Sequence, residues 1–393
     1  MKLPTQAEYI INKLREAGFE AFAVGGCVRD TLMGRTPGDW DICTSALPAQ
    51  VEKVFAEERV VETGLKHGTV TLVLDHTPYE ITTYRTEGEY KDFRRPESVC
   101  FVTDIREDLS RRDFTVNAMA YSPQKGIVDL FEGQKDIENK VIRCVGNPEK
   151  RFSEDALRIL RGLRFASVLG FEIENETAKA ILNLCGLLKN ISAERINVEF
   201  TKLLSGTNRK EILLDFKEVF EEILPLPFEG DWTSAVEMAT KTEDVKICKA
   251  VLFHLLYHDS EKVRIALRSL RSDNELTSFC VNFSKHFDLP VPENMAEIRK
   301  NVNLAGYEIY YDIMAFRGEE KVLEALKEIK EKNLCCHVSS LEINGRDLMV
   351  MGFSGKSVGE ILEKLLLLVM EEKTENKKDA LLNCAKNLKG DIK

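Results

Sequence analysis

The sequence predicts an α+β fold, in which a small mixed β-sheet head is followed by a long all-α region. Short runs rich in β-branched residues, bounded by glycine, proline and aspartate, fill the chain from Met1 to about Val145. Helical periodicity begins after Gly146-Asn147-Pro148 and continues through the rest of the chain. Strands first and helices afterwards are typical of a compact domain that carries a helical extension.

The head combines two predicted helices with four predicted strands. The first helix lies near Glu8 to Glu16, and a shorter one, CVRDTLMG, follows the first strand at 27–34. The strands are AFAV (21–24), WDICTS (40–45), TVTLVLDH (69–76) and YEITTYR (79–85). Because these runs alternate apolar with polar residues and end at turn-forming residues, we expect them to form one sheet.

The remainder of the chain predicts several small helical units. Ser153 is the expected N-cap of a helix over EDALRILRGLRFASVLG (154–170), whose apolar residues recur near the helical repeat. Breaks rich in glycine, proline and asparagine follow at 206–208, 224–232 and 289–292. We therefore divide the chain into a head (1–147), a neck (148–205), a body (206–330) and a tail (331–393).

Composition limits the classes of function. The chain has 393 residues, of which 44% are hydrophobic and 31% charged, as in ordinary globular proteins of more than one domain. Its net charge of −10 argues against indiscriminate coating of nucleic acid, which depends on an excess of Lys and Arg. The apolar run 365–370 is far shorter than the roughly 20 residues that span a bilayer. With no apolar signal core at the N-terminus, we expect a cytoplasmic protein without membrane partners.

Two adjacent glycines, Gly25 and Gly26, separate the first strand from the helix that follows. Residues without Cβ let the backbone approach a bulky anion, and the helix directs its first amide groups to the same point. This pattern favours a phosphate-binding turn, although a purely structural turn has the same sequence. It lacks the GxGxxG spacing of dinucleotide-binding folds.

Asp39 and Asp41 are two residues apart on a predicted strand, so both carboxylates are expected on one face. Like charges so close repel each other unless a cation lies between them, and hard oxygen ligands favour Mg²⁺. Glu80 lies on a later strand and is a candidate third carboxylate, with an ordinary exposed glutamate as the alternative. Together with a phosphate-binding turn, the pair predicts two-metal nucleotidyl transfer.

Four motifs in order give the chain a family resemblance. GGCVRDTLMG, DWD, LSRRDFTVNAMAY (109–121) and EDALRILRGLRF (154–165) resemble the class II tRNA nucleotidyltransferases, which comprise CCA-adding enzymes and bacterial poly(A) polymerases of the DNA polymerase β-like superfamily. The resemblance covers about the first 205 residues, and NGRDLMVMGFSGKSVGEILEKLL (344–366) resembles the C-terminal region of Gram-positive CCA-adding members.

The resemblance implies a role for each matching residue. Asp39 and Asp41 would be the catalytic, Mg²⁺-binding carboxylates, and the nucleotide would contact Gly26, Arg29 and Arg112, with Asn117 shaping the sugar pocket. Asp155 and Arg158 would select the base. The expected nucleotide-binding residues also include Arg161 and Arg164, directed toward phosphates and the RNA end.

Hydrogen-bond chemistry agrees with that role for Asp155 and Arg158. The two are three residues apart and, on one helix, would be neighbours. Arginine only donates and aspartate only accepts. Cytosine and adenine both present an amino donor beside a ring-nitrogen acceptor, whereas uracil and guanine present the reverse. An Asp–Arg pair can therefore accept C and A and reject U and G, although an ordinary ion pair has the same spacing.

The resemblance predicts an enzyme that adds C, C and A to the 3′ end of tRNA from CTP and ATP, releasing pyrophosphate. DNA is not an expected partner. A bacterial poly(A) polymerase and an A-adding-only tRNA enzyme remain alternatives, because they share the catalytic residues. The charged segment 85–102 resembles a loop that in the family helps the site change from C to A addition, which favours full CCA synthesis, although an ordinary solvated loop has the same composition. A hydrolase suggested by His254, His258 and Asp259 is disfavoured, because His254 and His258 lie on an apolar helix where core packing is expected.

Overall fold

The computed structural model describes residues 1–88 and 99–388, which form two compact units. The first unit comprises 1–227 with 269–271, and the second comprises 228–268 with the residues from 272 onward. Each unit is described by itself. The middle of the expected 85–102 loop, residues 89–98, lies outside the described residues.

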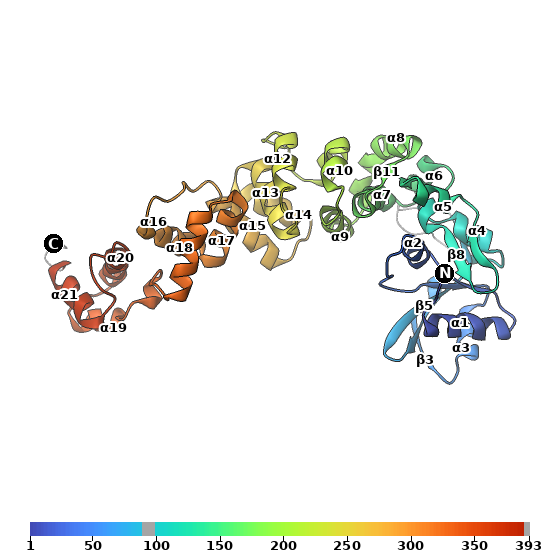
Figure 1. The fold of residues 1–393 in the computed structure, drawn as a ribbon, viewed down its shortest axis with the longest axis horizontal. Coiled ribbons are helices and arrows are strands. Elements are labelled where there is room, and N and C mark those ends of the chain that lie inside the picture. The colour runs from blue at the N-terminus through green and yellow to red at the C-terminus, as the bar shows by residue number, and fades with distance from the viewer. Residues whose placement is uncertain (89–98, 389–393) are drawn as a thin grey trace. The chain divides into compact units, whose positions relative to one another are not determined.

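A mixed sheet forms the centre of the head (Figure 1). Among the described residues it has seven strands in the order β3-β4-β5-β2-β1-β8-β9. The strands are β1 (Ala21–Val24), β2 (Ile42–Thr44), β3 (Arg59–Gly64), β4 (Thr69–Leu74), β5 (Thr77–Thr83), β8 (Met119–Ser122) and β9 (Gly126–Asp129). Strands β2 and β5 pair in parallel, and the other neighbours are antiparallel. Two smaller pairs are β6 (Arg85–Glu87) with β7 (Val99–Phe101) and β10 (Val141–Ile142) with β11 (Glu172–Ile173).

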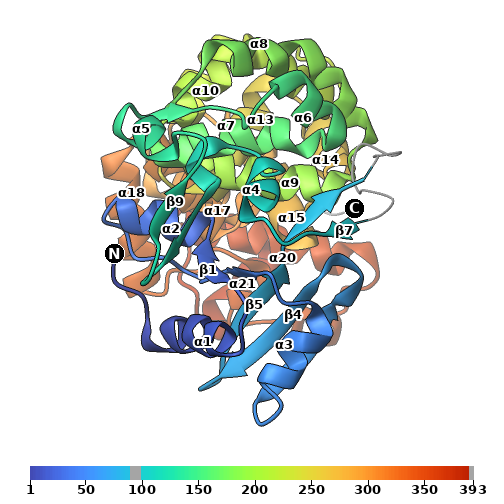
Figure 2. The same ribbon diagram turned by 90° about the vertical axis from the view of Figure 1, so that its right-hand side faces the viewer.

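Alternation along the central strands sends side chains to two separate cores. Ala21 and Ala23 of β1 pack in one cluster, whereas Phe22 and Val24 pack in another on the opposite face. The first cluster is closed by α1 (Thr5–Glu16) and α3 (Pro48–Val54), which cover one face of the sheet (Figure 2). The second cluster includes Leu109 of α4 (Ile105–Ser110). The predicted head fold is thereby confirmed.

Further helices complete the first unit. They are α2 (Gly26–Leu32), α5 (Gly133–Glu138), α6 (Pro148–Glu154), α7 (Leu157–Leu169), α8 (Asn175–Leu184), α9 (Ala193–Leu204), α10 (Arg209–Asp215) and α11 (Lys217–Ile223), with 3₁₀ turns η1 (Leu65–His67), η2 (Thr115–Asn117) and η3 (Cys185–Asn190). The predicted helix start at Ser153 is wrong. Asn147 caps α6 by accepting the backbone N–H of Lys150, and Pro148 occupies the first helical position, where its missing N–H costs nothing.

The second unit is helical throughout its described residues, as predicted. It contains α12 (Trp232–Ala239), α13 (Val245–Tyr257), α14 (Ser260–Ser269), α15 (Asn274–His286), α16 (Met295–Ala305), α17 (Tyr307–Arg317), α18 (Glu320–Glu331), η4 (Val338–Ser340), α19 (Gly345–Val350), α20 (Lys356–Met370) and α21 (Lys378–Leu388). Within it, the buried Arg299 of α16 donates to the carbonyl oxygens of Cys335, Val369 and Met370 and so ties α16 to the end of α20. No helix of the described chain is both long and apolar enough to cross a membrane.

A close backbone contact fixes α7 against the turn that ends α9. Ser167 of α7 donates from Oγ to the carbonyl of Leu203 at 2.7 Å, and its own carbonyl accepts the N–H of Asn208 at 3.0 Å. Gly206 lies so close to Ser167 that a Cβ at this position would come within 2.1 Å of Oγ and 2.4 Å of the carbonyl carbon. Position 206 therefore requires glycine, because any side chain would collide with Ser167.

We predict that Gly206→Ala destabilises the first unit by about 1–3 kcal/mol, the usual cost of overpacking a tight contact. Denaturant unfolding followed by fluorescence would measure this loss. Gly186→Ala is the matched control, because a Cβ at Gly186 meets nothing within 4 Å. Equal stability of the two variants would contradict the tight contact between α7 and the α9–α10 turn.

Candidate active site

The Asp39–Asp41 segment lies beside the glycine turn at the centre of the sheet. The backbone carbonyl of Asp41 accepts the N–H of Val24 at 3.0 Å, one residue before Gly25. Strand β2 begins only at Ile42, so the prediction that both aspartates lie within the strand is wrong. They directly precede it, and this hydrogen bond extends the β1–β2 pairing to Asp41.

Three carboxylates converge at this edge of the sheet. The parallel register pairs Ile42 with Ile81, which places Asp41 opposite Glu80 on the neighbouring strand β5. Asp39, Asp41 and Glu80 all reach solvent, and surrounding protein atoms partly desolvate Asp41. That desolvation, together with repulsion from Asp39 and Glu80, raises the pKa of Asp41 to about 6, while Arg112 acts in the opposite direction.

Gly25 provides the close approach that the glycine pair predicts. Its backbone has φ +83° and ψ −130°, a conformation that side chains with a Cβ rarely adopt, and it forms the N-cap of α2. A Cβ here would lie 3.0 Å from Nη1 of Arg112. The guanidinium of Arg112 therefore lies directly on the glycine turn.

Arg112 is anchored by a buried aspartate. Asp108 is fully buried and accepts from Nη2 of Arg112 at 3.3 Å and from Nη2 of Arg111 at 2.7 Å. Burial opposes ionisation of Asp108, but Arg112 and Arg111 outweigh it and lower its pKa. The buried Nε of Arg112 has no hydrogen-bond partner among the described residues.

Hydrogen bonds connect Arg29 of α2 to the neck helix α7. Nη1 of Arg29 donates to Oδ1 of Asn117 at 2.5 Å, and Nδ2 of Asn117 donates to Oδ1 of Asp113 at 3.2 Å. The other oxygen of Asp113 pairs with Nη2 of Arg161 at 2.6 Å. Burial disfavours the charged form of Asp113, but Arg161 outweighs this effect and lowers the pKa of the carboxyl to about 2.

Phe165 gathers three guanidinium groups around its ring. The carbon atoms of these groups lie 5.2, 5.3 and 3.9 Å from the ring centroid for Arg29, Arg161 and Arg164 respectively. Nε of Arg164 lies 2.9 Å from Oε2 of the buried Glu199 on α9. Arg161 and Arg164 are thus held by acidic partners from two other elements.

Asp155 and Arg158 are arranged differently from the expectation. Asp155 has extended backbone angles, φ −133° and ψ 103°, in the break between α6 and α7, so the two are not neighbours on one helix. Oδ2 of Asp155 pairs with Nη2 of Arg195 at 3.2 Å. Arg158 donates to Oε2 of Glu154 at 3.1 Å and to the carbonyl of Arg111 at 2.9 Å, and so links α7 to the segment that carries Arg112.

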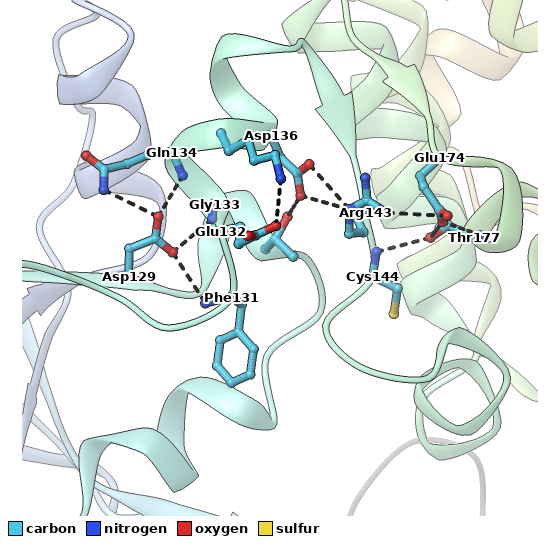
Figure 3. Close-up of polar contacts among 12 residues, drawn as sticks. Asp129, Phe131, Glu132, Gly133, Gln134, Asp136, Arg143, Cys144, Glu174 and Thr177 are labelled. Atoms are coloured by element: carbon cyan, nitrogen blue, oxygen red, sulfur yellow. Dashed lines mark hydrogen bonds and ion pairs between the residues drawn. The ribbon is translucent and has the colours of Figure 1, made fainter.

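A second polar cluster surrounds the start of α5 and Arg143 (Figure 3). The buried Asp136 of α5 accepts from Oγ1 of Thr115 at 2.7 Å and from Nε of Arg143 at 3.1 Å. Asp129 accepts the backbone N–H groups of Gly133 and Gln134 at the start of α5. Because Thr115 lies two residues before Asn117, the cluster fixes the turn that holds Asn117 against Arg29.

Sequence reasoning missed the supporting acids, namely Asp108, Asp113, Asp136, Glu154 and Glu199. For Asp108 a signal existed, since it lies four residues before Arg112 and three before Arg111, the spacing of helical ion pairs. Asp113 and Glu199 carry no such local signal, because their arginine partners lie far away in the sequence.

Known proteins resemble this chain over nearly its whole length. A curated CCA-adding enzyme from Ligilactobacillus salivarius is 40% identical over 396 residues, covering 96% of this chain and 95% of the relative. Another from Leuconostoc mesenteroides is 37% identical, covering 98% and 96% respectively. The chain belongs to the CCA-adding enzyme family.

Models of the family's domains match consecutive parts of the chain. The Poly A polymerase head domain matches residues 21–143, and "Probable RNA and SrmB-binding site of polymerase A" matches 170–227. A tRNA nucleotidyltransferase domain 2 matches 240–385. The head is thus of the DNA polymerase β-like nucleotidyltransferase class, whose members generally depend on metal ions.

Solved structures of the family have the same fold. The CCA-adding enzyme of Bacillus stearothermophilus, determined in complex with CTP, is 32% identical and covers 100% of both chains with a TM-score of 0.83. The Thermotoga maritima enzyme, solved with tRNA, is 22% identical and covers 98% of this chain and 95% of its own, with a TM-score of 0.71.

Of the two histidines that suggested a hydrolase, His254 lies in the core as expected, whereas the core-packing prediction for His258 is wrong, because His258 is exposed at the C-cap of α13 with φ +49°. His254 is buried on α13, with Nδ1 3.0 Å from Oγ of Ser284 and Nε2 3.3 Å from Oδ2 of Asp288. Asp259 accepts the backbone N–H groups of Glu261 and Lys262 at the start of α14. Both residues therefore have structural partners within the second unit.

We predict that Gly25→Ala lowers CTP incorporation about a hundredfold, because a new Cβ displaces the Arg112 guanidinium on which orientation depends. Gly34→Ala is the matched control, since Gly34 has φ +71° but nothing within 4 Å of an added Cβ. Both variants place alanine at a positive φ, and only Gly25→Ala brings a Cβ against Arg112. Equal incorporation by the two would contradict the packing of Arg112 on this turn.

Proposed function

We propose that this protein adds C, C and A to the 3′ end of tRNA from CTP and ATP, releasing pyrophosphate. The observation that carries this proposal is similarity to CCA-adding enzymes over nearly the whole chain, including residues 240–385, where the match is to a tRNA nucleotidyltransferase domain. The site geometry agrees, since carboxylates and guanidinium groups surround a glycine turn suited to a triphosphate.

The carboxylate cluster suits a divalent cation such as Mg²⁺. Desolvation, with added repulsion from Asp39 and Glu80, raises the pKa of Asp41, and a cation beside these carboxylates would favour the charged form. No arrangement of three or more metal-ligating side chains occurs among the described residues. Mg²⁺ characteristically combines one or two carboxylates with waters and substrate phosphates, so Asp39 and Asp41 are sufficient protein ligands. When bound, the ion activates the attacking hydroxyl and stabilises charge on the triphosphate.

Residues around the glycine turn would hold the nucleotide. Gly26 leaves room for a phosphate group at the start of α2, and Arg112 has an unpartnered buried Nε beside it. Arg29 is fixed by Asn117 and supplies positive charge from the same side. These groups would orient the triphosphate and stabilise the charge that develops on the leaving pyrophosphate.

Residues of the neck would select the base and receive the RNA end. Asp155 offers acceptors to the amino group that cytosine and adenine share, and Arg158 offers donors to the adjacent ring nitrogen. Arg161 and Arg164, stacked on Phe165, would complete the positive wall of the nucleotide site. We further propose the division into head (1–147), neck (148–205), body (206–330) and tail (331–393), with the tail contacting tRNA.

We predict that Asp41→Asn lowers nucleotide incorporation by at least about a thousandfold while leaving tRNA binding nearly unchanged, because loss of one ligand removes catalytic charge stabilisation. Single-turnover incorporation and filter binding would measure the two effects. Removing divalent ions with EDTA should abolish incorporation by the wild type. Asp75→Asn, an exposed change in the head, is the control. Undiminished turnover by Asp41→Asn would refute the metal assignment.

The products on tRNA distinguish CCA addition from poly(A) synthesis, which the name of the matching head domain keeps as a second candidate. Given a tRNA transcript without its last three nucleotides, CTP and ATP, we predict a single product ending in CCA, checked by sequencing. With ATP alone, a transcript that lacks CC should remain almost unextended. Long A tracts on either transcript would favour the poly(A) polymerase.

A further inference from the structure

We propose that Arg195 is a positioning residue for nucleotide selection, because it holds the Asp155 carboxylate in the orientation that accepts the base. This inference rests on the proposed role of Asp155 in base selection. Arg195 lies on α9, outside the motifs that suggested the site, and acts on the base only through Asp155.

Two restraints fix the Asp155 carboxylate. Oδ1 accepts the backbone N–H of Leu157 at 3.1 Å, and Oδ2 accepts from Nη2 of Arg195 at 3.2 Å. With one contact on each oxygen, the plane of the carboxylate is set, and each oxygen keeps a lone pair free for another donor. Without Arg195, only the hydrogen bond from the backbone N–H of Leu157 would restrain the carboxylate. The carboxylate could then turn about its Cβ–Cγ bond.

The location of Asp155 makes an external restraint important. In the break between α6 and α7 the backbone of Asp155 bonds to Arg151 and Arg158, so the main chain is held while the direction of the carboxylate depends on its side-chain contacts. The helix α9 packs along α7 (Figure 1), and Arg195 in its first turn pairs with Asp155 in this break. One helical turn further along, Glu199 contacts Arg161 and Arg164. The same face of α9 therefore supports both the base-selecting and the phosphate-directed residues.

The Arg195 side chain is not arranged for stability alone. Its Nη1 is buried and has no hydrogen-bond partner among the described residues. A buried donor without a partner is unfavourable for folding, so a purely structural ion pair would be expected to satisfy it. The side chain is only about one-third exposed, at 30%, and Asp155 at 17%, so the pair is partly shielded from competing water.

A loosened Asp155 would impair selection more than chemistry, because Asp39 and Asp41 lie on other elements and are unchanged. A site that hydrogen-bonds its substrate discriminates through the geometry of those bonds. For Arg195→Met, we expect kcat/KM for CTP and ATP to fall about tenfold, mostly through KM, and the preference over UTP and GTP to narrow by a similar factor. Arg195→Lys, which keeps a charge and donors, should be intermediate.

The test measures single-nucleotide incorporation on tRNA transcripts with each of the four nucleotides, using the full-length chain with Mg²⁺. The variants are Arg195→Met, Arg195→Lys and Asp155→Ala, with Glu194→Gln, the exposed neighbour on α9, as control. Thermal unfolding of each variant is recorded alongside. A merely structural role for Arg195 would lower the unfolding temperature and all four rates together, without changing their ratios.

The outcomes separate this inference from the function on which it rests. The positioning role is supported if the preference for CTP and ATP over UTP and GTP narrows in both Asp155→Ala and Arg195→Met, while Glu194→Gln keeps the wild-type preference. If Asp155→Ala loses the preference for CTP and ATP but Arg195→Met keeps the wild-type ratios of the four incorporation rates, only the role of Arg195 is overturned. If Asp155→Ala keeps wild-type ratios, the base-selecting assignment of Asp155 is wrong, and the role of Arg195 is overturned with it.

Discussion

Repulsion among carboxylates is the physical constraint around which the head is organised. The parallel pairing of β2 with β5 brings Asp41 opposite Glu80, and Asp39 precedes it by two residues. Desolvation and the neighbouring carboxylates together raise the pKa of Asp41, and the sheet holds these like charges near one another despite their repulsion. Arg112 offsets part of it from the glycine turn. A fold that holds like charges together in this way favours binding of a divalent cation that is also coordinated by the phosphates of the nucleotide.

The neck extends the same electrostatic arrangement away from the sheet. Buried polar side chains link the positively charged groups, from Arg29 through Asn117 and the acid Asp113 to Arg161, and the acid Glu199 pairs with Arg164. Each acid both neutralises an arginine and fixes its direction, which long flexible side chains cannot do for themselves. The site is consequently preorganised: its cations are placed before a triphosphate arrives, and little reorganisation is needed during the reaction.

Local sequence patterns indicated the principal motifs and strands β1, β2, β4 and β5, but they missed β3, β8 and β9 and the contacts between elements. The paired glycines and the DWD spacing indicated the turn and the carboxylate pair, because both depend on residues a few positions apart. The prediction that Asp155 and Arg158 are neighbours on one helix was wrong. A break at Asp155 separates α6 from α7, and helical periodicity does not reveal this break. Arg195 and Glu199 could not be found in this way, because their partners are set by the packing of α9 on α7.

Anomalous diffraction from crystals grown with Mn²⁺ and a non-hydrolysable CTP analogue would test most directly whether the clustered carboxylates form a cation site. We predict an anomalous peak about 2.1 Å from carboxylate oxygens of both Asp39 and Asp41 and in contact with the analogue's phosphates. A fully occupied analogue with no peak at this pair, or with the metal held elsewhere, would contradict the account.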